Sequence, residues 1–224
     1  MKDLPFVICH MIESVDGRID CPITEHLPGT GDCYSILDSL NYDAVISGRH
    51  TAELEMSLKG EFVSKEGPIG QETVYVDHLG TGFEVIMDAK GTLLWEDRKE
   101  GNPLLIVTSE LASVDYLAYL KERHISYIAT GKEHIDLTRS LEIMKASFGF
   151  HRVAIVGGPK INAGFLNAGL LDEISMIIGS GIDGREGYEG SFDGLKEGAR
   201  LHLLKIKEVK QLENAVWIIY SVKN

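Results

Sequence analysis

Two glycine-containing turns are the segments of this sequence best suited to bind an anion. Gly157–Gly158 follows the apolar run Val153–Val156 and opens onto Pro159 and a helix-compatible segment. Ser47–Thr51, which reads Ser-Gly-Arg-His-Thr, follows another apolar run earlier in the chain. A helix start offers unpaired N–H groups and the positive end of its dipole, and glycine lets an anion approach the backbone closely. The two turns therefore predict one dinucleotide whose phosphates are held from both sides.

The elements that must position these turns are predicted from hydrophobic periodicity. Amphipathic patterns over Val114–Arg123 and Leu137–Phe148 predict helices between strands. This alternation favours an α/β fold with a mostly parallel central sheet flanked by helices. Leu201–Val209 and Ala215–Val222 alternate apolar and polar residues around the turn Gln211–Asn214, which predicts a C-terminal antiparallel hairpin. The apolar runs of strand length are Phe6–Met11, Ala44–Ile46, Phe83–Met87, Leu104–Val107, Ser126–Ala129, Val153–Val156 and Ile174–Ile178.

Two polar, glycine-rich segments interrupt this pattern. Ser57–Gly82 has weak periodicity and is predicted to be an active-site flap or excursion. Gly179–Gly194 is glycine-rich and acidic and lies just beyond a strand. The chain of 224 residues shows no repeat, low-complexity tract or linker and is long enough for a large core. One domain over residues 1–224 is therefore expected.

The composition argues against several classes of partner. The net charge of −12 argues against binding of nucleic acid or of an anionic membrane, both of which need a basic face. Cys9, Cys21 and Cys33 form no C-x-x-C pair, so free thiols in a reducing cytosol are expected, and no metal site. The first apolar run, Phe6–Ile8, is too short for a signal peptide or a membrane span. A cytoplasmic protein is expected.

Four stretches of the chain resemble the signatures of one superfamily. They are Ile12–Ile19 with Ser-Val-Asp-Gly-Arg, Asp43–Thr51 with a strand and a Gly-Arg-x-Thr turn, Val156–Gly158 with paired glycines, and Gly169–Ile174 with Gly-Leu-Leu-Asp-Glu-Ile. In this order they resemble the dihydrofolate reductase-like superfamily, and most closely the RibD C-terminal domain family of riboflavin-pathway pyrimidine reductases. The resemblance covers essentially the whole chain. A glycine pair alone also fits a plain tight turn, so the interpretation depends on the combination.

The resemblance implies NADPH as the hydride donor and often a homodimer. Arg49 is the stronger candidate for the 2′-phosphate of the adenosine ribose, because a guanidinium binds phosphate through two parallel bonds. The resemblance also implies a cis peptide between Gly157 and Gly158, although a cis bond without proline is costly. The residues implied to contact the cofactor are Gly48, Arg49, His50 and Thr51 on one side, Gly157, Gly158 and Lys160 on the other, and Thr108 and Ser109 beside the 2′-phosphate.

Two departures from the family pattern concern the substrate. Val156 stands where riboflavin-pathway reductases usually carry a glutamate, whereas dihydrofolate reductases have an aliphatic residue there. The expectation of cofactor binding is unaffected, but the substrate contact is put in doubt. The family's polar segment after the first strand, and its later basic residue that grips a ribose phosphate, have no assigned counterpart here, and Leu27–Asp32 stands in their stead.

Four side chains near the first strand are candidates for substrate contact or for structural roles. Asp32 is a candidate because a buried carboxylate accepts two parallel N–H bonds from a 2-aminopyrimidinone ring; the alternative is an ordinary helix N-cap. Asp16 either orders the first loop, which its Asp-Gly context favours, or touches substrate. Arg18 either meets a substrate phosphate or is solvated. For His10, a satisfied core histidine is favoured over a catalytic base.

These features lead to one main hypothesis and two alternatives. The main hypothesis is an NADPH-dependent reductase of the riboflavin-pathway type. It would transfer a hydride to C1′ of a 5-amino-6-(5-phosphoribosylamino)pyrimidine such as the uracil, in its ring-opened imine form, and give the ribitylamino product. No catalytic acid is compulsory, because water can protonate the imine nitrogen. The alternatives are a reductase of a pterin, dihydrofolate or another small C=N compound, which Val156 favours, and an NADP-binding protein that has lost catalysis.

Overall fold

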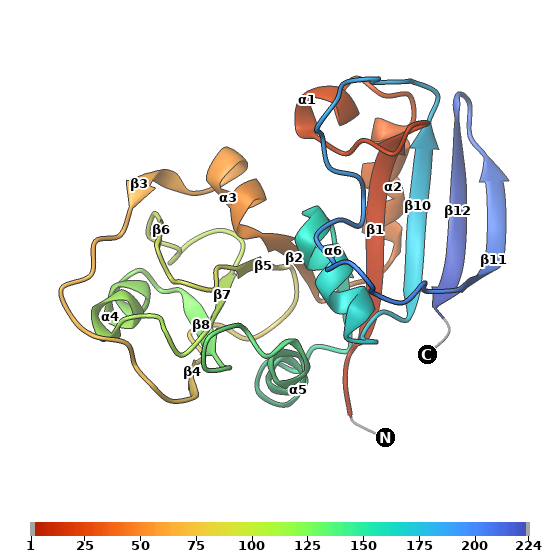
Figure 1. Ribbon diagram of the computed structural model, residues 1–224. Helices are drawn as coiled ribbons and strands as arrows, with labels where there is room; N and C mark the ends of the chain where they lie inside the picture. Colours follow the sequence, from red (N-terminus) through yellow and green to blue (C-terminus); the bar gives the residue numbers. More distant parts are fainter. Residues whose placement is uncertain (1–2, 223–224) are drawn as a thin grey trace. The chain divides into compact units, whose positions relative to one another are not determined.

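The computed structural model describes residues 3–222, apart from the side chain of Cys21. The chain divides into two compact units, each built from two segments (Figure 1). We call residues 3–5 and 42–153 the central unit, and residues 6–41 and 154–222 the terminal unit. The expected free thiol of Cys21 lies outside the described part of the structure.

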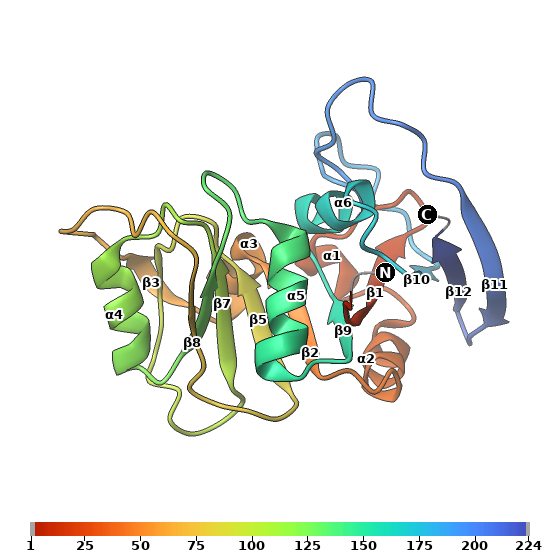
Figure 2. The same cartoon turned by 90° about the horizontal axis from the view of Figure 1, so that it is seen from below.

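A mostly parallel sheet forms the centre of the central unit. Its neighbouring strands are, in order, β2 (Ala44–Gly48), β5 (Phe83–Met87), β7 (Leu104–Thr108), β8 (Ser126–Ala129) and β4 (Thr73–Tyr75). The first four run parallel, as β7 and β8 do in Figure 2, and β4 pairs antiparallel with β8. Every residue of β7 and β8 is buried, as expected of parallel strands that are covered on both faces.

Helices cover both faces of this sheet. The helices of the unit are α3 (Arg49–Glu55), α4 (Val114–Glu122) and α5 (Leu137–Phe148), and a separate antiparallel ribbon joins β3 (Leu58–Glu61) to β6 (Leu93–Leu94). Tyr116 of α4 packs in one buried cluster with Ile86 of β5. The ring of Phe148 in α5 lies 5.7 Å from that of Phe83. Because Phe83 and Ile86 lie three residues apart in one strand, they face opposite sides of the sheet.

The terminal unit has a mixed sheet. Its neighbouring strands are, in order, β11 (Leu204–Gln211), β12 (Ala215–Val222), β10 (Glu173–Gly179) and β1 (Phe6–Ser14), and its helices are α1 (Cys21–Thr24), α2 (Thr30–Ser39) and α6 (Pro159–Asn167). β1 and β10 are parallel, and β12 runs antiparallel to both β10 and β11. The carboxylate of Asp172 accepts the amide N–H of Val7 at 2.7 Å and so ties the starts of β10 and β1 together. β9 (Arg152–Ile155) contains the point where the chain passes from the central to the terminal unit.

The sequence predictions for the regular elements are largely confirmed. Each predicted strand is present, the two predicted helices are α4 and α5, and the C-terminal hairpin is formed by β11 and β12. β1 runs beyond its predicted end at Met11 as far as Ser14. The segment Ser57–Gly82 contains the short strands β3 and β4, which lacked a clear pattern in the sequence. Its role as a flap stays a prediction.

The start of α2 differs from the prediction. One interpretation of Asp32 was a helix N-cap, but α2 begins at Thr30 with Gly29 as its N-cap. Gly29 has φ 93°, and a Cβ at this position would lie 2.8 Å from the Cβ of Ala215, so both conformation and packing require glycine. The hydroxyl of Thr30 also donates to the carbonyl of Thr24 at 2.6 Å. Asp32 therefore lies in the first turn of α2 and is not its N-cap.

Gly131, in the loop that follows β8, offers a test of the central unit. It has φ 84°, and an added Cβ would overlap the carbonyl oxygen of His134 and lie 2.6 Å from the amide nitrogen of Asp136. We expect Gly131→Ala to destabilise the fold by about 2 kcal/mol or more, which lowers the thermal midpoint by roughly 5 °C. Gly67→Ala is the matched control, because a Cβ at Gly67 meets nothing within 4 Å. Equal midpoints for the two variants in a thermal melt would contradict this account of the loop.

Candidate functional site

The first predicted anion-binding turn lies at the carboxyl end of β2. Ser47 and Gly48 are buried, and Gly48 is the N-cap of α3, which begins at Arg49. Gly48 has φ −87° and ψ 165°, an extended conformation that any residue adopts. Glycine is therefore not needed for the local conformation, and its benefit at this position is close approach to the backbone. His50 is exposed and Thr51 is half-buried.

The guanidinium of Arg49 is already engaged by its own unit. Nε donates to Oε1 of Glu53 at 2.8 Å, Nη2 donates to Oε1 of Glu61 at 2.6 Å, and Nη1 donates to the hydroxyl of Thr92 at 2.6 Å. Burial alone lowers the pKa of Arg49, but the bonds to Glu53 and Glu61 and the charge of Asp88 raise it overall. The group predicted to hold a phosphate is thus a permanent cation surrounded by carboxylates.

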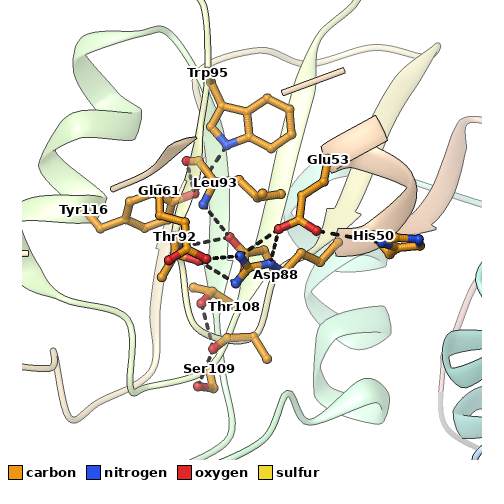
Figure 3. A network of polar contacts seen from close by, with 12 residues as sticks. His50, Glu53, Glu61, Asp88, Thr92, Leu93, Trp95, Thr108, Ser109 and Tyr116 are labelled. Atoms are coloured by element: carbon orange, nitrogen blue, oxygen red, sulfur yellow. Dashed lines mark hydrogen bonds and ion pairs between the residues drawn. The ribbon is translucent and has the colours of Figure 1, made fainter. Parts of the chain in front are cut away.

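Asp88 is the most deeply buried of these carboxylates, and sequence reasoning missed it. It directly follows β5, and none of its side chain is exposed. Its Oδ2 accepts the amides of Thr92 and Leu93 at 2.8 and 3.0 Å (Figure 3). Its Oδ1 has no hydrogen-bond partner among the described residues and lies 3.9 Å from Nη1 of Arg49. A signal was available in the sequence, because an acidic residue at the carboxyl end of a parallel strand is placed where α/β folds bind ligands.

Thr108 and Ser109 join the same network but do not face solvent. Both residues are fully buried. Their hydroxyls donate to the carbonyl of Ala89, at 3.2 Å from Thr108 and 2.7 Å from Ser109. They therefore fix the loop that carries Asp88, and in this structure their hydroxyls are not presented to a 2′-phosphate. The two residues lie at the end of β7, as the sequence predicts, and a contact between their loop and a 2′-phosphate stays a prediction.

The second predicted turn lies in the terminal unit. Gly158 is the N-cap of α6, and Pro159 is the first residue of the helix, as the sequence predicts. The expected cis peptide between Gly157 and Gly158 is not present, and no peptide bond among residues 3–222 is cis. The chain turns instead through Gly157 at φ 150° and Gly158 at φ 5°. Glycine conformational freedom makes the turn without a cis bond.

The long glycine-rich loop between β10 and β11 lies against the start of α6. Lys160, predicted to contact phosphate, is exposed, and its Nζ lies 3.6 Å from a carboxylate oxygen of Glu189. Asn162 is fully buried and donates from Nδ2 to the carbonyl of Ser191 at 2.8 Å. Gly194 approaches Lys160 so closely that a Cβ would lie 3.0 Å from the Cγ of the lysine. The segment beyond β10 is thus anchored on the helix that the glycine pair opens.

Asp16 anchors the other end of this loop. One oxygen of its carboxylate accepts the hydroxyl of Ser14 at 2.6 Å and the amide of Asp183 at 3.0 Å, and the other accepts the amide of Gly184 at 2.9 Å. These bonds, the one from Ser14 first, hold the pKa of Asp16 well below its usual range. The structure therefore supports the loop-ordering interpretation of Asp16, and its two oxygens are occupied.

Arg18 and Arg185 also serve the loop. The guanidinium of Arg18 donates to the carbonyl of Tyr188 and, at 3.4 Å, to that of Arg185. Arg185 in turn forms ion pairs with Asp183 at 2.5 Å and with Asp20 at 2.8 Å. Arg18 is therefore neither freely solvated nor directed to a phosphate in this structure.

Asp32 is exposed in the first turn of α2. The substrate-binding hypothesis required a buried carboxylate, and this part of the prediction is wrong for the unliganded chain. A negative charge in the first turn is stabilised by the helix dipole, which explains an acidic residue at this position without a ligand.

His10 is a satisfied core histidine, as the sequence favours. Its Nε2 lies 2.9 Å from the carbonyl oxygen of Cys33, which only accepts, so this nitrogen carries the proton. Its Nδ1 then accepts the hydroxyl of Ser175 at 2.9 Å, and that oxygen accepts the indole N–H of Trp217 at 2.8 Å. Burial lowers the pKa of His10 and raises that of the Cys33 thiol to about 11. Cys33 is a free thiol, as is the buried Cys9.

Glu13 is a second carboxylate that sequence reasoning missed. It lies near the end of β1, half-buried, and accepts the hydroxyl of Ser191 at 2.5 Å. Burial raises the pKa of Glu13, and the bond from Ser191 opposes that rise. The available signal was its position: Glu13 is an acidic residue inside a largely apolar strand.

The predicted residues thus separate into two groups. Gly48–Thr51, Thr108 and Ser109 belong to the central unit, and the structure links Arg49 to the loop after β5 that Thr108 and Ser109 hold. The remaining predicted residues belong to the terminal unit, namely Asp16, Asp32, Gly157, Gly158 and Lys160. Within residues 3–222, no helix is long and apolar enough to cross a membrane, and no group of three or more His, Cys, Asp or Glu side chains is arranged to hold a metal ion.

The fold and the order of these motifs define a member of the dihydrofolate reductase-like superfamily. Residues 5–217 match the RibD C-terminal domain, and the chain belongs to that family. The match runs through both units; one domain over residues 1–224 stays a prediction.

One curated relative and several solved structures are similar to the chain. The relative is the 2,5-diamino-6-ribosylamino-4(3H)-pyrimidinone 5′-phosphate reductase of Methanothermobacter thermautotrophicus, 31% identical over 126 residues. That alignment spans 54% of this chain and only 56% of the relative. A pyrimidine reductase-like protein of Corynebacterium diphtheriae superposes with a TM-score of 0.73 at 16% identity, covering 98% of this chain and 92% of that one. Riboflavin biosynthesis reductase Rib7 of Saccharomyces cerevisiae superposes with a TM-score of 0.65 at 17% identity, covering 98% of this chain and 90% of that one. These structures establish the shared fold.

Asp16 provides a test of how the loop is ordered. We expect Asp16→Asn to weaken the bonds to the amides of Asp183 and Gly184, so that trypsin cleaves after Arg185 about tenfold faster than in the wild type. Limited proteolysis followed by mass spectrometry measures this rate. Asp38→Asn, which removes an exposed carboxylate from α2, is the control and should keep the wild-type rate. Equal cleavage of all three proteins would refute the anchoring role.

His10 provides a pH test. Because its folded pKa lies below its unfolded value of about 6.5, the unfolded chain takes up the proton first. The stability that neutral His10 contributes is complete above that unfolded value and decreases as the pH falls below it. We therefore expect the thermal midpoint of wild type to fall more between about pH 7.5 and about pH 5.5 than that of His10→Gln.

The raised pKa of Glu13 changes stability in the opposite direction, and it does so in wild type and in His10→Gln alike. The difference between these two proteins therefore reports on His10. His26→Gln removes an exposed histidine and should keep the wild-type pH dependence. If His10→Gln has the wild-type slope as well, His10 is not the group that titrates.

Proposed function

We propose that the protein is a nicotinamide-dependent reductase of the riboflavin pathway. The observation that carries the proposal is the pair of glycine-opened helices: Gly48 precedes α3 and Gly158 precedes α6, each directly after a strand. The first N–H groups of a helix have no partner within the helix itself, and such groups favour phosphate oxygens. Membership of the RibD C-terminal domain family and the similarity to an archaeal pyrimidine reductase support the same reaction class.

NADPH is the proposed hydride donor, and it supplies a hydride from C4 of its nicotinamide ring. Gly48, Arg49, His50 and Thr51 would bind it in the central unit, and Gly157, Gly158 and Lys160 would bind it in the terminal unit. The chain contributes by binding and orientation, because the hydride chemistry is that of the cofactor. Lys160 is the most direct candidate for a phosphate contact, since its ammonium is exposed and its ion pair with Glu189 is long, at 3.6 Å.

The proposed substrate is a 5-amino-6-(5-phosphoribosylamino)pyrimidine in its ring-opened imine form. The relative from Methanothermobacter thermautotrophicus is named for the 2,5-diamino-pyrimidinone. The substrate that the family resemblance implies is the corresponding uracil. The hydride adds to C1′ and the imine nitrogen takes a proton from water, which gives the ribitylamino product. Glu13 is the half-buried carboxylate of the terminal unit whose raised pKa suits proton transfer, but the reaction does not require it.

Two alternatives keep specific support. Val156 in place of the usual glutamate favours reduction of a pterin, dihydrofolate or another small C=N compound. The missing glutamate, together with the lack of an assigned residue for the ribose phosphate, supports the second alternative, an NADP-binding protein without catalysis. We also propose a cytoplasmic homodimer without nucleic-acid or membrane partners. Self-association is supported by the exposed Ile206 and Val209 on β11, which is the edge strand of the terminal unit. Analytical ultracentrifugation would detect the dimer.

Steady-state turnover separates these possibilities. We expect purified protein to oxidise NADPH with the diamino-pyrimidinone phosphate or its uracil counterpart and not with dihydrofolate, measured by loss of the reduced nicotinamide absorbance. Turnover of dihydrofolate alone would establish the first alternative. Tight NADPH binding without turnover of any of the three compounds would establish the second.

A variant pair tests the cofactor contact within the same assay. Lys160→Gln should raise the KM for NADPH by about fivefold, because one charge-assisted bond to phosphate is lost. Lys196→Gln removes an equal charge from an exposed position between β10 and β11 and should leave the KM unchanged. An unchanged KM in Lys160→Gln removes this residue from the proposed site.

A further inference from the structure

The surroundings of Arg49 are unusually acidic for a phosphate-binding group. Within 4 Å of its guanidinium lie Glu53 at 2.8 Å, Glu61 at 2.6 Å and Asp88 at 3.9 Å. The only other side chain bonded to it is the neutral Thr92, among the described residues. Three carboxylates thus face one cation, so the potential at this edge of the central unit opposes a further negative charge.

The three carboxylates differ in how firmly they are held. The side chain of Asp88 is fully buried, and Glu53 follows Arg49 by one turn of the same helix. Glu61 comes from β3 and its side chain is 67% exposed. A ligand that competes for Arg49 from solvent therefore displaces Glu61 first.

The position of Glu61 is nevertheless fixed by the fold. The next residue, Phe62, packs its ring 5.2 Å from that of Tyr116 and 5.0 Å from that of Tyr119. The amide of Phe62 also donates to the carbonyl of Thr92 at 2.8 Å. The core contact of Phe62 holds the backbone of Glu61 within reach of Arg49, so the Glu61 carboxylate can pair with the guanidinium without rearrangement of the fold.

These observations bear on the choice between two cofactors. A phosphomonoester such as the 2′-phosphate of NADPH carries up to two negative charges near neutral pH, and it must replace Glu61 to reach Nη2 of Arg49. NADH has a ribose hydroxyl at that position, and a hydroxyl donates a hydrogen bond to a carboxylate without loss of the ion pair. A carboxylate here therefore penalises NADPH and accepts NADH.

We propose that Glu61 is a specificity-determining residue that competes with the 2′-phosphate for Arg49 and so reduces the preference of the protein for NADPH over NADH. This inference rests on the proposed function, since it takes Arg49 as part of the cofactor site. β3, at the start of the segment Ser57–Gly82, then has a role in cofactor selection. The wild-type protein then discriminates less strongly against NADH than a variant without this carboxylate.

The test compares full-length wild type with Glu61→Gln and Glu66→Gln. Both variants remove one negative charge from the same exposed segment. Of these two glutamates, Glu61 is the one with an ion pair to Arg49 among the described contacts. Dissociation constants for NADPH and NADH are measured by fluorescence titration, and KM values for both are measured with the pyrimidine phosphate. Glu61→Gln should increase the ratio of NADH to NADPH dissociation constants about tenfold, and Glu66→Gln should leave it within about twofold of wild type.

Glu61→Lys is a second variant that should shift the ratio further in the same direction, because it places a new cation beside the phosphate. Thermal melts of all variants verify that the exposed substitutions leave the fold intact. An unchanged ratio in Glu61→Gln, or a loss of NADPH affinity in it, would overturn the inference while leaving the reductase proposal in place. Failure of wild type to bind either dinucleotide would overturn both.

Discussion

The buried carboxylate of Asp88 is the constraint on which the central unit and its candidate site both depend. A fully buried negative charge is strongly unfavourable unless cations and N–H groups compensate it. Here the amides of Thr92 and Leu93 bond one oxygen, and the guanidinium of Arg49 lies near the other. The turn after β2, the loop after β5 and the end of β7 therefore form one polar network at the carboxyl edge of the sheet. Arg49 is needed by the protein before any ligand arrives.

A second kind of ordering acts in the terminal unit, where the long segment after β10 has little regular structure. Its backbone groups are bonded by side chains from elsewhere in the unit, with Asp16 at one end and Asn162 at the other. Ser191 adds a bond from the loop to Glu13. Such contacts satisfy backbone donors and acceptors that a helix or sheet would otherwise satisfy. A glycine-rich sequence thus takes a defined path beside the start of α6.

The fold was largely predictable from the sequence because its parallel strands are buried on both faces and read as continuous apolar runs, as in Leu104–Val107. β3 was not predictable, since a short exposed strand carries no such pattern, and β6 was not predictable, since its two residues are too few to form one. For the site, the glycine turns were found at their correct places. Asp88 was missed because a single aspartate after a strand looks like any loop residue until its burial is seen. The start of α2 at Thr30 depends on packing of Gly29 against Ala215, a contact between distant parts of the sequence.

The contact of Arg49 with Asp88 has a consequence for the comparison of related chains. In a related chain that binds no dinucleotide, selection for folding alone would still retain this arginine as long as the aspartate corresponding to Asp88 stayed buried. A Gly-Arg turn is therefore a marker of ancestry and core electrostatics as much as of cofactor use. Glu61 on β3 can be replaced more easily when the ligand changes. It is exposed, so its loss destabilises the core less than the loss of the buried Asp88 would.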